Sequence, residues 1–177
     1  MKKPILNLIT AAAALTFMST SLQTQANEGD MFVGVMANHA IYESENADDV
    51  GLSAVTLRFN YEFLDNHMVE TRLSTSFSDH TVNDTEFSLK SLYGAYYSYN
   101  YEVTKKLAVY GLAGFSSIEV KTARFDVANT EDQVLVSYGA GFTYQIGKDA
   151  NVNFEGVLYG DDDVKYAAVG AGIELLF

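Results

Sequence analysis

The C-terminal segment, Tyr166–Phe177, alternates apolar residues with small or polar ones. Phe177, Leu175 and Ile173 fall on one face, while Glu174 and Gly172 fall on the other, and this period of two predicts a β-strand with one apolar face. An apolar strand with an open edge promotes aggregation, and closure of the sheet into a barrel removes that edge. The segment therefore predicts the closing strand of a β-barrel whose apolar face points outward.

The same alternation recurs along the chain and predicts eight strands, with no helical segment after the N-terminal region. In chain order, these expected strands are Met31–Tyr42, Leu52–Phe63, Met68–Ser78, Phe87–Tyr101, Leu107–Val120, Val134–Ile146, Asn151–Tyr159 and Tyr166–Phe177. The facing of the first and fifth strands stays open; in the first, Phe32 and Val33 compete for the apolar side. The expected fold class is all-β, an eight-stranded antiparallel up-and-down transmembrane β-barrel.

The expected connections alternate in length. Polar loops of eight residues or more follow the first, third and fifth strands, whereas short turns follow the second, fourth and sixth; the long loops are Glu43–Val50, Asp79–Glu86 and Lys121–Gln133. This asymmetry is typical of outer-membrane barrels, whose longer loops face outside and whose short turns face the periplasm. The last connection, Gly160–Val164, is an exception because it is short although it should lie outside.

Charged residues lie on the polar faces of the expected strands. A membrane barrel directs such side chains inward, where they must pair. The expected interior charge network is Arg58, Glu62, Glu70, Arg72, Glu155 and Glu174, accompanied by Tyr96 and Asn60. The interior of an eight-stranded barrel is just wide enough to be filled by side chains. The network is therefore predicted to be a structural plug, and a gated proton or ion path is the alternative.

Aromatic residues gather near the expected strand ends. Near the short turns are Tyr61, Phe63, Tyr99, Tyr101, Tyr144, Phe154 and Phe177, and near the long loops are Phe77, Phe87 and Tyr138. Outer-membrane barrels carry two such aromatic girdles, one at each edge of an apolar band. The aromatic positions therefore favour a lipid-exposed barrel over a soluble sandwich.

The N-terminal segment predicts export. Lys2 and Lys3 precede a nearly uncharged apolar stretch, Ile5–Met18, and small residues at Thr24 and Ala26 fit a signal-peptidase site after Ala26. The stretch is shorter than the ~20 residues that a membrane-spanning helix needs. We expect a signal peptide over residues 1–26, an outer-membrane β-barrel domain over residues 27–177, and a location in the outer membrane of a Gram-negative bacterium.

Composition narrows the classes of partner. Without Lys2 and Lys3, nine basic side chains remain against 23 acidic ones, a net charge of −14. So acidic a chain is not expected to bind nucleic acid. It has no cysteine, and its single proline is Pro4 in the expected signal peptide, so every later residue can donate a backbone hydrogen bond to a strand ladder. We expect a monomer without a cofactor or metal.

Three internal stretches and the C-terminus resemble a known family. The stretches are Arg58–Phe63 running through the turn to Glu70, Leu92–Tyr97 and Leu107–Gly114. They are similar to the small eight-stranded outer-membrane barrels, a group that includes OmpX, Ail and the transmembrane part of OmpA. Gly172, Leu175 and Phe177 look like the signal that the barrel-assembly machinery reads. Two departures are Gly170, where a polar residue is usual, and Glu174, where many relatives carry a basic residue.

The resemblance implies a protein of surface interaction (adhesion) or envelope integrity that acts through its extracellular loops, with lipid, lipopolysaccharide and the assembly machinery as partners. A narrow porin-like channel is the alternative. We expect no enzyme, although a meeting of His39, Asp79 and Ser78 would resemble a nucleophile–base arrangement. Asp161–Asp163 with Asp48 and Asp49 could bind a divalent cation; a solvated turn is the simpler interpretation. The net negative charge of the loops disfavours sulfated glycans as ligands.

Overall fold

A computed structural model describes residues 28–43, 50–76, 80–82, 85–124, 127–160 and 165–177. Within these ranges the chain forms nine antiparallel strands: β1 (Met31–Glu43), β2 (Val50–Leu64), β3 (His67–Ser76), β4 (His80–Val82), β5 (Thr85–Glu102), β6 (Leu107–Arg124), β7 (Val127–Gln145), β8 (Ala150–Gly160) and β9 (Lys165–Leu176). No helix in this part of the chain is long and apolar enough to cross a membrane.

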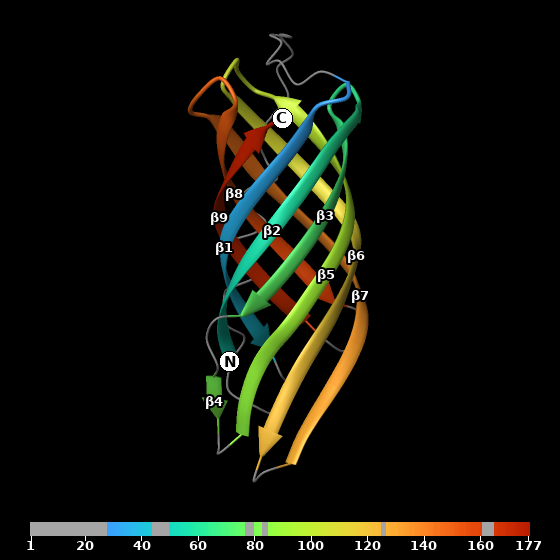
Figure 1. The fold of residues 1–177 in the computed structure, drawn as a ribbon, viewed down its shortest axis with the longest axis vertical. Helices are drawn as coiled ribbons and strands as arrows, with labels where there is room; N and C mark the ends of the chain where they lie inside the picture. The colour runs from blue at the N-terminus through green and yellow to red at the C-terminus, as the bar shows by residue number, and fades with distance from the viewer. Residues whose placement is uncertain (1–27, 44–49, 77–79, 83–84, 125–126, 161–164) are drawn as a thin grey trace, which may run out of the picture.

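The eight long strands close into a barrel (Figure 1). Each pairs with the next long strand in sequence, β9 returns to pair with β1, and β3 pairs directly with β5. The short β4 pairs only with β5, just beyond the end of β3, and is the one described strand outside the closed ring. The predicted all-β, eight-stranded antiparallel up-and-down barrel is therefore confirmed.

Three short turns lie at one end of the barrel, which we call the periplasmic end. They connect β2 to β3, β5 to β6, and β7 to β8, as predicted. Asn66 in the first turn has a φ of 66°, a left-handed conformation that asparagine tolerates better than most residues. The C-terminus lies at the same end, where the Phe177 N–H donates to the Met31 carbonyl at 2.9 Å. Strands β1 and β9 are thus joined up to the last residue.

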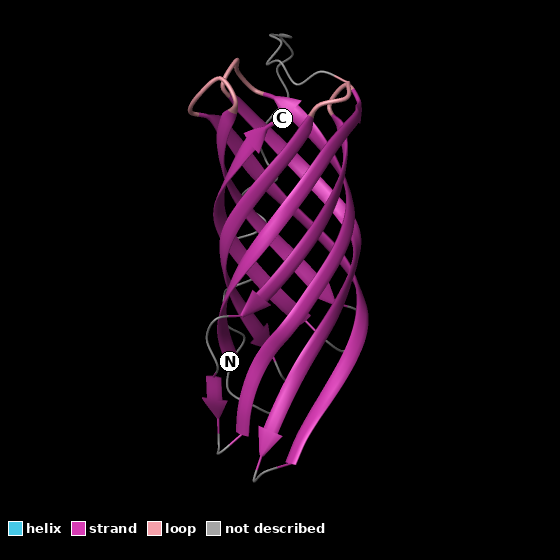
Figure 2. Ribbon diagram, in the orientation of Figure 1, coloured by secondary structure: helices cyan, strands magenta, loops and turns pink. Residues whose placement is uncertain are grey.

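At the opposite, extracellular end, β5, β6 and β7 extend beyond the other strands (Figure 2). The prediction that Asp79–Glu86 and Lys121–Gln133 are loops was wrong. Both segments contain residues that pair in β-strands. Val82 pairs with Thr85, and Arg124 pairs with Val127. A ribbon outside the bilayer has water on both faces and needs no apolar alternation. The pattern therefore could not reveal it. Residues 44–49 and 161–164 lie outside the described residues.

The two strands of undecided facing are oriented by their neighbours. In β1, Phe32 and Met36 point inward and are buried, whereas Val33 and Val35 are exposed on the outer face. In β6, Tyr110, Leu112, Ser116 and Ile118 are buried inside the barrel, whereas Phe115 is exposed outside. Both faces of these strands are largely apolar. Only the pairing register distinguishes the lipid side from the interior.

The outer surface carries exposed apolar and aromatic side chains, as a lipid-facing surface requires. Near the periplasmic turns, His67 Nδ1 lies 2.5 Å from the Tyr97 hydroxyl and its ring packs edge-on against Tyr99. Near the same end, the rings of Phe142 and Phe154 stack at 5.0 Å. These contacts form the periplasmic aromatic girdle. Tyr138 is exposed nearer the extracellular end, while the side chains of Phe77 and Phe87 lie outside those described.

Candidate functional site

Four charged side chains form one buried ion-pair network inside the barrel. Glu70 accepts from Arg58 Nε and Nη2 at 2.7 and 3.0 Å, and from Arg72 Nε at 2.5 Å. Arg72 also donates to both carboxylate oxygens of Glu155, at 2.5 and 2.6 Å. The network contains two positive and two negative charges. It is therefore electrically balanced, which buried ions require.

The strand register explains the shared role of Glu70. Arg58 on β2 and Arg72 on β3 are direct cross-strand partners, and like charges placed opposite each other destabilise a sheet. Glu70 lies two residues from Arg72 on the same inner face and bonds both guanidinium groups. Its carboxylate compensates the repulsion. Glu155 reaches the same pair from β8, with Oε2 at 3.8 Å from Arg58 Nη2.

Two tyrosines pack against the arginines. The Arg72 guanidinium lies 4.6 Å from the centre of the Tyr96 ring, and that of Arg58 lies 5.8 Å from the Tyr110 ring. The Tyr110 hydroxyl donates to Glu155 at 3.0 Å. Each ring occupies the space over a glycine, because a Cβ on Gly94 would lie 2.4 Å from the Tyr96 ring and one on Gly141 would lie 2.6 Å from Tyr110. These glycines make room for the ring that covers each arginine.

From the two tyrosines that contact the ionic network towards the extracellular end, apolar side chains fill the interior. The buried cluster is Ala40, Leu52, Ala54, Leu92, Tyr96, Tyr110, Leu112, Ile118, Leu135, Val157, Tyr159 and Tyr166. Between the two levels, the Tyr96 hydroxyl contacts Ser116 Oγ at 2.6 Å, which in turn contacts Ser137 Oγ at 2.8 Å. The interior is thus occupied at successive levels by ionic, hydroxyl and apolar groups.

The other two predicted network residues lie apart from the ion pairs. Among the described residues, Glu174 accepts from three amide donors, Asn151 at 3.2 Å, Asn153 at 3.2 Å and Asn60 at 3.5 Å. Glu62 accepts the backbone N–H of Asn66 at 2.7 Å. The structure therefore brings together four of the six predicted charges. Tyr110, Asn151 and Asn153 were not predicted as site residues, although Asn153 lies on the polar side of its strand next to Glu155.

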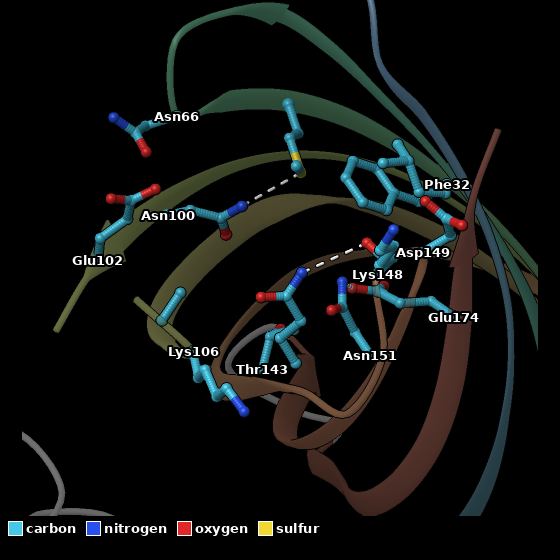
Figure 3. Close-up of a pocket in the computed structure, with 14 residues that line it drawn as sticks. Phe32, Asn66, Asn100, Glu102, Lys106, Thr143, Lys148, Asp149, Asn151 and Glu174 are labelled. Carbon is cyan, nitrogen blue, oxygen red and sulfur yellow. Dashed lines mark hydrogen bonds between the residues drawn. The ribbon is translucent and has the colours of Figure 1, made fainter. Parts of the chain in front are cut away.

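A small cavity of about 90 Å³ opens at the periplasmic end. Figure 3 shows Glu174 and Asn151 in its wall, with Lys106, Lys148 and Asp149 nearer the turns. The lining is rich in amide and carboxylate oxygens. The carboxylate of Glu174 is therefore adjacent to a space that communicates with the periplasmic side.

Outside the barrel, Lys90 pairs with Glu119. Lys90 lies at a register shift between Leu89 and Ser91, and its side chain is exposed. Glu119 pairs with Asp132, in the part of β7 that extends beyond β8. The hydrogen bond from Lys90 lowers the pKa of the Glu119 carboxyl below its usual value of 4.5.

The alternative catalytic and metal residues are not assembled in the described structure. His39 Nδ1 lies 3.5 Å from Ser53 Oγ, whereas Ser78 and Asp79 fall outside the described residues. Asp48, Asp49 and Asp161–Asp163 also fall outside them. Among the residues that are described, no group of three histidine, cysteine or acidic side chains is placed to hold a metal ion.

Solved structures of several bacterial proteins share this fold. Ail from Yersinia pestis superposes with a TM-score of 0.68 at 17% identity, over 85% of this chain and 100% of that one. Neisserial surface protein A gives 0.67 at 15% identity, over 85% and 100%. The N-terminal barrel domain of OprF from Pseudomonas aeruginosa gives 0.61 at 17% identity, over 82% and 97%. At these identities the likeness establishes the fold.

The family is established by the sequence. No curated protein matches the chain at a significant level, but the model of the outer membrane protein beta-barrel domain matches residues 10–177, nearly the whole chain. Together with the closed barrel and its apolar outer surface, this match places the chain in the bacterial outer membrane. The chain belongs to the outer membrane protein beta-barrel domain family.

Proposed function

We propose that this protein is a closed barrel that acts through its extracellular face, in surface interaction such as adhesion or in envelope integrity. The filled interior supports the closed state, because the ionic network and the apolar cluster occupy successive levels and their members are buried. An eight-stranded barrel leaves little space beyond its own side chains. A conducting pore would require both levels to rearrange. Lipid, lipopolysaccharide and the assembly machinery are the proposed envelope partners.

One observation carries the surface role. β7 pairs with β6 from Val127 to Tyr144, but its pairing with β8 covers only Ser137–Gln145. Among the described residues, Val127–Val136 therefore has a strand neighbour on one side only. The free N–H and C=O groups of such an edge can pair with a strand added by another protein. The extended β4–β7 sheet is thus the proposed interaction surface.

The negative charge of the extracellular segments disfavours a sulfated ligand. Ail has been crystallised with the heparin analogue sucrose octasulfate. Here the segments expected at the extracellular end include Asp48, Asp49 and Asp161–Asp163, and like charges across an interface are unfavourable. We therefore favour a protein partner over a sulfated glycan for this chain.

The test shortens the extended sheet. Bacteria that lack their own adhesins would display either the wild-type barrel or a variant in which Ile118–Gln133 is replaced by an Asn-Gly turn flanked by the paired residues Ser117 and Val134. Attachment to cultured epithelial cells should fall to the level of cells without the barrel, while a shift between boiled and unboiled gel samples shows that the variant is folded. A second variant, with residues 44–49 replaced by six glycine and serine residues, should still attach. Undiminished attachment by the shortened variant would refute the proposal that the unpaired edge of β7 binds the partner.

A further inference from the structure

His67 lies in the aromatic girdle on the outer surface, at the periplasmic end of the barrel. It is the first residue of β3, directly after the turn from β2, and it pairs with Tyr99 on β5 (Figure 1). The centre of its ring lies 4.9 Å from that of Tyr99 and 6.2 Å from that of Phe63. Girdle side chains lie at the level of the lipid headgroups. His67 is therefore placed to contact a headgroup.

The contact with Tyr97 orients the imidazole ring. Tyr97 pairs with Val69, which lies two residues further from the turn than His67, so Tyr97 approaches His67 from the side of the membrane core. His67 Nδ1 lies 2.5 Å from the Tyr97 hydroxyl. The two ring nitrogens of a histidine are separate groups with separate partners. Because Nδ1 faces Tyr97, Nε2 is turned away from the membrane core, towards the headgroups.

The hydrogen-bonding capacity of the two side chains assigns the tautomer of His67. A phenol has one O–H to donate, and a neutral imidazole donates from one nitrogen and accepts at the other. Within the described structure, the Tyr97 hydroxyl bonds only Nδ1. If Nδ1–H donated to this hydroxyl, the phenolic proton would have no acceptor at an apolar surface. Donation from Tyr97 to Nδ1 satisfies both groups, and it leaves the ring proton on Nε2.

The Nε2–H group of His67 is then a donor directed at the lipid headgroups. No described residue accepts from it. A phosphodiester oxygen is a charged acceptor, and hydrogen bonds to charged acceptors are stronger than those between neutral groups. The outer face below the girdle is apolar, with Val69 47% and Tyr97 45% exposed. One phospholipid can therefore bind Nε2–H through its phosphate and cover this face with its acyl chains.

The charge beside His67 selects the kind of headgroup. Asp65 is exposed in the same turn, two residues before His67. An anionic headgroup would bring its net negative charge close to this carboxylate. An ethanolamine headgroup instead carries an ammonium group, which a carboxylate attracts and which the face of an aromatic ring such as Phe63 also attracts. A zwitterionic headgroup thus matches the donor of His67 and the acceptor of Asp65.

We propose that His67, oriented by Tyr97, binds the phosphate of a phosphatidylethanolamine molecule in the periplasmic leaflet, with the ammonium group of the lipid beside Asp65. The Nε2–H group donates to a phosphate oxygen, and the acyl chains lie along the outer face of β3 and β5. The site lies at the end of the barrel opposite to the proposed interaction surface and does not depend on the proposed function.

The test detects lipid phosphorus next to His67 by magic-angle-spinning NMR. The refolded full-length barrel carries ¹³C,¹⁵N-labelled histidine and the substitutions His39→Gln and His80→Gln, which leave His67 as the only histidine. Its bilayer contains phosphatidylethanolamine and a galactolipid without phosphorus. A ¹⁵N–³¹P dipolar coupling should be found at Nε2, which should be the protonated nitrogen. The coupling should be lost in Tyr97→Phe, where no hydroxyl orients the ring.

The matched control is Tyr144→Phe. Tyr144 is also a girdle tyrosine, 44% exposed on β7, and no described histidine contacts it, so the coupling should be unchanged. Phosphatidylglycerol in place of phosphatidylethanolamine should weaken the coupling, and inorganic phosphate added to the barrel in maltoside micelles should give none. If the double histidine substitution does not fold, the wild-type barrel is compared with His67→Phe, and the coupled signal that disappears belongs to His67.

Four results would overturn the site. They are a ring proton on Nδ1, no coupling in phosphatidylethanolamine, equal coupling in phosphatidylglycerol, and coupling to inorganic phosphate in micelles. The third would remove the role of Asp65 in selecting the headgroup, and the fourth would show that an anion binds without the lipid.

Discussion

Arg72 on β3 and Glu155 on β8 join opposite walls of the barrel through two parallel hydrogen bonds of 2.5 and 2.6 Å. The two strands are not neighbours, since β3 pairs with β2 and β5, and β8 pairs with β7 and β9. The pair therefore acts as a brace across the interior. Arg72 also bonds Glu70 on its own strand, so its loss affects both buried carboxylates.

Removal of Arg72 should strongly destabilise the barrel. Arg72→Ala leaves Glu155 without its two short bonds, and breaking a buried pair in this way costs about 3–5 kcal/mol. The free energy of unfolding of the refolded barrel in urea measures the loss. Lys90→Ala is the control, because its ion pair with Glu119 is exposed and such pairs contribute about 0–1 kcal/mol. If the two substitutions lowered the free energy of unfolding equally, the Arg72–Glu155 pair would not stabilise the barrel as proposed.

The folded barrel should not conduct ions in a planar bilayer. Even Arg72→Ala should stay silent, because Leu92, Leu135 and their apolar neighbours still fill the level nearer the extracellular end. Single-channel recording measures the conductance, and a boiled-versus-unboiled gel shift confirms that folded protein was used. Stable conductance steps that change in Arg58→Ala or Arg72→Ala would instead identify a small porin.

Gly94→Ala should destabilise the barrel by about 1–3 kcal/mol, the usual cost of overpacking. The added Cβ would lie 2.4 Å from the Tyr96 ring, and the ring would have to leave its position against Arg72. Urea unfolding again measures the change. Gly156→Ala provides a comparison, because a Cβ at that position meets nothing within 4 Å. A Gly94→Ala barrel as stable as Gly156→Ala would show that the ring can shift freely.

Phe177→Ala should reduce assembly in cells more than it reduces stability. The side chain is 76% exposed, so its removal costs little packing, while the backbone N–H of residue 177 can still donate to Met31. If Phe177 belongs to the signal read by the assembly machinery, membrane-inserted protein should fall several-fold while refolding in detergent stays normal. Parallel losses in both assays would assign Phe177 a structural role instead.

The pattern of residues predicted much of the fold, and the reason is the membrane itself. Lipid outside and a filled interior impose strict alternation on strands such as Leu52–Phe63, whose outer residues are apolar and whose inner residues are polar. The six interior charges were predicted for the same reason: an inward position is the only one that such side chains can occupy in a lipid-exposed strand. In strands with two apolar faces, such as β1, the pattern does not indicate which face points towards the lipid. The extended ends of β6 and β7 gave no strand pattern.

The sequence by itself determined the fold class, the number of strands in the barrel, the periplasmic turns and the residues with charge in the interior, because each follows from local alternation. Only the tertiary structure decided which charges meet. Arg58, Glu70 and Arg72 come from neighbouring strands, but Glu155 reaches them across the barrel, and Glu174 is held apart among amides. These pairings depend on strand register and on barrel closure, which no single segment encodes.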